Sequence, residues 1–107
     1  MVEIFTGRRA IQHSIEDNCN FQGMDLENKY SAYNPLHCYD ECYANTNCTH
    51  FTWIPKSMQG WPHCFLKKGT TLKDVEKTKD SNSKGNKCGV IASRLASMLR
   101  NLLLFLS

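Results

Sequence analysis

The stretch NPLHCYDECYANTNCTHFTWI, residues 34–54, carries the clearest structural signals in the chain. Its first half predicts a helix, because Asn34 can cap the N-terminus and Pro35 suits the first helical position, where its missing N–H costs nothing. The polar run at residues 45–47 ends the helix. Residues 48–54 are rich in β-branched and aromatic side chains with a period of two, which predicts a strand.

Both cysteines of the predicted helix lie on its apolar face. At about 100° per residue, Cys38 and Cys42 point the same way, into the core. The arc predicted to face the core is Leu36, Cys38, Tyr39, Cys42 and Tyr43.

The predicted strand has a partner at residues 63–67, and the two predict a hairpin. Phe51 and Trp53 share one face of the first strand, which is the predicted core side. Cys64 and Leu66 share a face of the second strand.

The flanking segments give weaker signals. Residues 1–18 are expected to form an arm or a first edge strand, and residues 19–26 a short strand that ends in a bend. Residues 68–87 are polar and predict a solvated connection with at most one weak strand.

Six cysteines, at positions 19, 38, 42, 48, 64 and 88, set the chemical class of the chain. So short a segment buries too little surface to be stable unaided, so an even cysteine count indicates disulfides and an extracellular or cell-surface protein. The formal net charge of +3 argues against nucleic-acid binding, and the 41% of hydrophobic residues argues against general disorder.

Helix geometry narrows the 15 pairings that six cysteines allow. Cys38 and Cys42 point in parallel, which is poor geometry for a bond between them, so each should reach elsewhere. The arrangement that this favours is Cys42 with Cys48, Cys38 with Cys64, and Cys19 with Cys88.

The alternative is a zinc site. Its ligands would be Cys38, Cys42, Cys48 and Cys64 with His50 or His63. Structural zinc sites usually show two pairs of ligands at short gaps, and the gaps here do not repeat in that way. The sequence therefore predicts no metal and no other cofactor.

The cysteine array with its neighbours resembles the PAN/apple domain. The residues that carry the resemblance are Cys19-Asn-Phe21-Gln-Gly23-Met-Asp25-Leu26, Cys38-x3-Cys42-x5-Cys48-x2-Phe51-x-Trp53, Cys64-Phe65-Leu66-Lys67 and Cys88. They cover residues 19–88, with an arm at 1–18 and a leucine-rich tail at 89–107 outside.

The resemblance implies an α+β fold: a single small disulfide-rich domain in which one helix packs on a curved antiparallel sheet. It implies the same three disulfides that helix geometry favours. It also implies a non-catalytic extracellular recognition module whose partner is a protein or a glycan. The residues fit this, since the four histidines are scattered and the chain has no nucleophile elbow, metalloprotease motif or phosphate loop.

The candidate ligand-binding residues are Trp61, His63 and Lys67. Trp61 lies in the hairpin loop and can stack on a sugar ring or anchor a protein contact, although the same side chain also suits a cap on the hairpin core. The lysines that could make a basic strip are Lys67, Lys68, Lys73, Lys77, Lys79, Lys84 and Lys87. Acidic residues interrupt them, which favours an ordinary solvated face.

Asn47-Cys48-Thr49 is a formal N-glycosylation acceptor. A glycan at Asn47 is therefore a further prediction, weighed against the chance occurrence of such triplets.

The two ends of the chain raise separate questions. Residues 90–107 place apolar side chains at helical spacing, and with Arg94 and Arg100 inside they are too short and too charged to span a membrane. An amphipathic helix there gives the alternative function, a small cationic membrane-active protein, and the bland alternative is a gene-model artefact. The N-terminus has no apolar run of the kind a secretion leader requires, so the chain is expected to be a fragment or an incomplete gene model.

Overall fold

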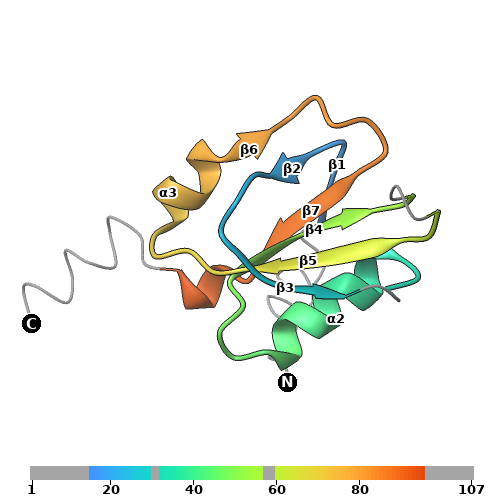
Figure 1. Ribbon diagram of the computed structural model, residues 1–107. Helices are drawn as coiled ribbons and strands as arrows, with labels where there is room; N and C mark the ends of the chain where they lie inside the picture. Colours follow the sequence, from blue (N-terminus) through green and yellow to red (C-terminus); the bar gives the residue numbers. More distant parts are fainter. Residues whose placement is uncertain (1–14, 30–31, 57–59, 96–107) are drawn as a thin grey trace, which may run out of the picture.

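The structure is a computed structural model that describes residues 15–29, 32–56 and 60–95 (Figure 1). In chain order its elements are β1 (Ile15–Asp17), β2 (Asn20–Phe21), β3 (Asp25–Lys29), α2 (Pro35–Ala44), β4 (His50–Ile54), β5 (His63–Lys67), α3 (Leu72–Lys77), β6 (Lys79–Asp80), β7 (Lys87–Val90) and a 3-10 turn (Ala92–Arg94).

Two layers cover a five-stranded antiparallel sheet of order β1-β7-β4-β5-β3. Helix α2 lies on one face, and the two-stranded ribbon of β2 and β6 with the short helix α3 lies on the side of the opposite face (Figure 1). The predicted fold class is confirmed: the chain is a small α+β domain with one main helix on an antiparallel sheet and three disulfides.

The predicted hairpin is confirmed. Strands β4 and β5 pair in antiparallel register, with Phe51 opposite Leu66 and Trp53 opposite Cys64. These four side chains belong to the core cluster beneath α2. The alternation of the sequence therefore predicted the face that meets the helix.

Helix α2 begins as predicted and buries a narrower face than predicted. Asn34 accepts a hydrogen bond from the backbone N–H of His37 at 2.8 Å, and Pro35 is the first helical residue. Cys38, Tyr39 and Cys42 are buried, but Leu36 is 46% exposed and Tyr43 is 60% exposed. The expectation that those two side chains enter the core was wrong, because a ten-residue helix tied to the sheet through Cys38 presents only a narrow stripe to it.

The second face of the sheet is also buried, which the sequence analysis did not predict. His50 and Thr52 have no exposed surface, although they alternate with the predicted core residues of β4. Phe21 of β2 covers them: its ring meets the His50 ring edge-on at 5.1 Å, and its backbone N–H donates to the Thr52 hydroxyl at 2.9 Å.

Residues 68–87 are more structured than expected. Thr71 caps α3 by accepting from the backbone N–H of Asp74, and Val75 is fully buried. The weak strand that the prediction allowed is β6, which pairs with β2. Apart from that strand, the expectation of a solvated connection was wrong, because Val75 inserts into a second core that it forms with Cys19, Phe21, Cys88 and Leu95.

The three disulfides join Cys19 to Cys88, Cys38 to Cys64, and Cys42 to Cys48. These are the pairs that helix geometry favours and that the resemblance implies. They occupy all six cysteines, so the thiolates that a zinc site needs are not available. The same holds for the cluster of Glu16, Cys19 and Cys88, whose sulfur atoms are bonded to each other.

Residues 90–95 do not form the helix expected from their spacing. Val90 ends β7, a 3-10 turn follows, and Ile91 and Leu95 are buried in the two cores. The rest of the expected helix, residues 96–107, lies outside the described residues, as do residues 1–14 of the expected arm. Within the described ranges, no helix is long and apolar enough to cross a membrane.

Arg94 closes the C-terminal end of α2. Its guanidinium donates to the backbone carbonyls of Cys42, Tyr43, Asn45 and Cys48 at 2.7 to 3.0 Å. Cys42 and Tyr43 are among the last four residues of α2, whose carbonyls lack the usual partner within the helix, and this one side chain bonds both of them and two carbonyls of the segment that follows.

Arg94→Lys is expected to lower the free energy of unfolding by about 1 to 3 kcal/mol, because one ammonium cannot replace the forked guanidinium across four carbonyls. Urea unfolding followed by tryptophan fluorescence measures the loss. Lys73→Ala, on the exposed side of α3, is the control and should change the value by less than about 0.5 kcal/mol. Equal stability of Arg94→Lys and the unmodified chain would contradict this role.

Gly69 has no room for a side chain. A Cβ atom there would lie 2.4 Å from the Val75 methyl carbon Cγ2. Gly69→Ala is therefore expected to cost about 1 to 3 kcal/mol of stability. Val75→Ala removes the clashing methyl group, so the double variant should lose less than the sum of the two single losses. Additive losses in urea unfolding would show that the contact is relieved elsewhere.

Candidate functional site

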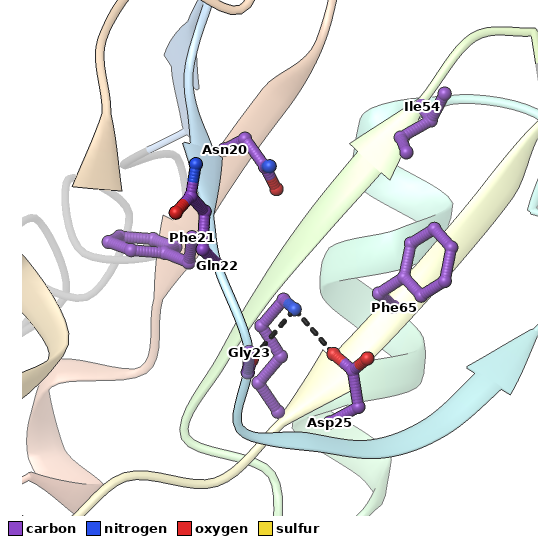
Figure 2. A pocket seen from close by; sticks show the side chains of 8 residues that line it. Asn20, Phe21, Gln22, Gly23, Asp25, Ile54 and Phe65 are labelled. Atoms are coloured by element: carbon purple, nitrogen blue, oxygen red, sulfur yellow. Dashed lines mark hydrogen bonds and ion pairs between the residues drawn. The ribbon is translucent and has the colours of Figure 1, made fainter. Parts of the chain in front are cut away.

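A hollow of about 260 Å³ lies between the β2–β3 bend and strand β5, and we call it the β5 groove. Its lining residues are Asn20, Phe21, Gln22, Gly23, Asp25, Ile54, Phe65 and Lys67. Figure 2 shows Asn20 on one side, Ile54 and Phe65 on the other, and Asp25 at the lower end. The volume is just under the range of roughly 300 to 1,000 Å³ that is usual for small-molecule sites.

Strand alternation creates the wall of the groove. Cys64 and Leu66 of β5 point to α2 and are buried, so His63, Phe65 and Lys67 share the opposite face. β2 pairs with β6 in the ribbon, while β3 pairs with β5 in the main sheet. The hollow lies beside the bend that joins β2 to β3.

Lys67 is tied down at the end of the groove. Its ammonium group donates to the Gly23 carbonyl at 2.9 Å and to the Asp25 carboxylate, and only 4% of the side chain is exposed (Figure 2). Gly23 adopts a φ of +73°, which a residue without a Cβ takes readily, and the bend there brings its carbonyl to the lysine. The Lys67–Asp25 pair cancels its own charge and fixes the carboxylate in place.

Phe65 packs between two of the predicted ligand residues. The His63 ring lies nearly parallel to the Phe65 ring, with centroids 5.9 Å apart, and the Lys67 ammonium is 5.7 Å from the Phe65 centroid. His63 is 2% exposed, and its Nδ1 lies 3.2 Å from the Trp61 carbonyl oxygen. Trp61 itself is 51% exposed and does not line the groove.

The three predicted ligand residues therefore lie at different places, and only one of them lines the groove. Lys67 lines the groove, and the His63 ring stacks on the ring of Phe65. Trp61 is exposed and does not line the groove. Sequence reasoning missed Phe65, whose alternation with His63 and Lys67 was the available signal. It also missed Asn20 and Asp25, which no local pattern connects to β5.

Acidic side chains pair with several of the lysines that could make a basic strip. Lys79 contacts Glu16 at 2.7 Å and Glu76 at 3.2 Å. Its hydrogen bond to Glu16 is the main cause of a raised pKa, opposed by burial. Lys87 pairs with Asp17 at 2.9 Å. With Lys67 also paired, three of the seven lysines are held by carboxylates, which fits the ordinary solvated face that the interrupting acidic residues favour.

Comparison of the sequence with known protein families supports this fold. The PAN domain family model matches residues 19–67, from the first cysteine to the end of β5. The resemblance to the PAN domain is therefore confirmed over this part of the chain. The chain matches none of the curated proteins. PAN domains are in general non-catalytic modules that bind proteins or carbohydrates, and they occur in extracellular proteins.

Beside Phe21, which lines the groove, the domain buries a neutral histidine. His50 is fully buried, its Nδ1 is 2.8 Å from the Thr49 hydroxyl, and its Nε2 has no hydrogen-bond partner among the described residues. Burial, and then the charge of Lys67, lower the pKa of His50 from 6.5 to about 4. The folded domain therefore requires the uncharged imidazole.

Stability is expected to fall as the pH drops from about 6.5 to about 4. The unfolded chain takes up a proton on His50 in this window and the folded chain does not, so unfolding becomes easier by about 3 kcal/mol in total. Urea unfolding midpoints at pH 7 and pH 4.5 measure the loss.

His50→Asn should flatten this dependence, because its amide can approach Thr49 and does not titrate. A pH dependence that survives in His50→Asn would assign it to other groups.

Proposed function

We propose that the chain is an extracellular recognition module that binds a glycan in the β5 groove. Two observations support the location outside the cell: a match to a family found in extracellular proteins, and a fold with all six cysteines in disulfides. The proposed module extends from residue 15 to residue 95, since β1 pairs with β7 and Leu95 is buried in the second core.

The chemistry of the groove carries the proposal. Ile54 and Phe65 supply an apolar wall, Asn20 supplies an amide that can donate and accept, and Asp25 supplies a carboxylate held by Lys67. Because Lys67 and Asp25 neutralise each other, the groove favours an uncharged ligand that offers several hydrogen-bonding groups. The hydroxyl-rich, partly apolar ring of a neutral sugar meets this description.

A protein partner is the second candidate, and a different surface favours it. Tyr33 is 76% exposed, Tyr43 is 60% exposed and Leu36 is 46% exposed, all on or next to α2. Aromatic side chains are enriched at protein interfaces, where they supply contact area at low entropic cost. This α2 surface lies on the face of the sheet opposite the groove (Figure 1).

A glycan array probed with the full chain tests the proposal, followed by titration of the bound glycans. Asn20→Ala is expected to raise the dissociation constant by about 3- to 10-fold, because one or two hydrogen bonds to the glycan are lost. Tyr33→Ala, on the α2 surface, is the matched control and should bind glycan as the unmodified chain does.

Two results would contradict the glycan proposal. The first is an array without a bound glycan. The second is a loss of binding in Tyr33→Ala with none in Asn20→Ala, which would move the site to α2.

A further inference from the structure

Asn47 lies in the turn between α2 and β4, at the acceptor position of Asn47-Cys48-Thr49. We propose that Asn47 carries an N-linked glycan and that the glycan is attached before the Cys42–Cys48 disulfide closes. The inference rests on the secretory route of the proposed function and is independent of the β5 groove.

The acceptor side chain is open to solvent. Asn47 is exposed, and its backbone N–H donates to the Asn45 side-chain oxygen at 3.0 Å. A sugar on its Nδ2 would extend away from the turn without displacing a buried group. The folded domain therefore tolerates the modified asparagine.

The third residue of the acceptor is inaccessible in the folded domain. Thr49 is 5% exposed, and its hydroxyl accepts from the backbone N–H of Gly69 at 2.8 Å and contacts the His50 ring at 2.8 Å. Its backbone N–H donates to the Lys67 carbonyl at 2.8 Å, and its carbonyl accepts from the N–H of Ile91 at 2.7 Å. An enzyme that must read the Thr49 hydroxyl on an extended chain cannot do so here.

The middle residue adds a second obstacle. Cys48 is fully buried in its bond to Cys42, six residues away, and its carbonyl accepts from Arg94 at 3.0 Å. Asn47 lies inside this small loop. Closure of the loop and sugar transfer therefore compete for the same unfolded segment, and the order decides whether a given molecule is modified.

The transfer itself requires the donor of the secretory pathway, a lipid-pyrophosphate-linked oligosaccharide. The Nδ2 atom of Asn47 bonds to the anomeric carbon, the bond from that carbon to the pyrophosphate oxygen breaks, and the lipid pyrophosphate leaves. One amide proton passes to the enzyme. No oxidant or reductant takes part, so the step is compatible with later disulfide formation.

The test expresses the full chain behind a cleavable secretion leader in cultured eukaryotic cells. The fraction of total chain that loses mass on treatment with a peptide N-glycosidase is read on a denaturing gel, so misfolded variants still count. The unmodified chain should be partly modified, and Asn47→Gln should show no loss of mass. Cys42→Ala should raise the modified fraction at least about twofold, because disulfide formation no longer competes on its timescale of seconds or longer.

Cys38→Ala is the matched control. It removes the other disulfide of α2 and leaves the Cys42–Cys48 pair intact, so its modified fraction should equal that of the unmodified chain. No glycosidase-sensitive mass in either the unmodified chain or Cys42→Ala would overturn the site. Equal fractions in the unmodified chain and Cys42→Ala, or an equal rise in Cys38→Ala, would overturn the proposed order. Because the leader supplies the route, neither result bears on the groove.

Discussion

The bond between Cys38 and Cys64 is the constraint on which the rest of the domain depends. It fixes α2 to β5 near the start of the strand, and both cysteines are fully buried in the core beneath the helix. A ten-residue helix is too short to be stable alone in water, so α2 needs this attachment. In the chain-entropy model, closing a loop over a sequence separation of 26 stabilises the fold by roughly 3.5 kcal/mol.

The β5 groove follows from which residues of β5 this bond turns toward the helix. With Cys64 and Leu66 turned to the helix, Phe65 and Lys67 must face the other way, into the β5 groove. The bend at Gly23 then places Asp25 against Lys67. A neutral, fixed pair of charges beside an apolar wall is thus a consequence of how the helix is tied to the sheet.

Local signals made much of this fold predictable. The Asn34-Pro35 cap and the alternation in β4 and β5 each specify an element without help from distant residues. The second core could not be predicted in the same way, because His50 and Thr52 are polar and α3 has one fully buried residue in six. Arg94 and Asp25 contact residues that are far away in the sequence. Composition and local spacing do not predict such contacts.

A disulfide map of the native chain tests the account most directly. Peptides from a digest without reduction, analysed by mass spectrometry, should contain three bridges and no free thiol. The account predicts the pairs Cys38–Cys64, Cys42–Cys48 and Cys19–Cys88. Free thiols at Cys38 and Cys64, or a bond between either of them and another cysteine, would contradict it.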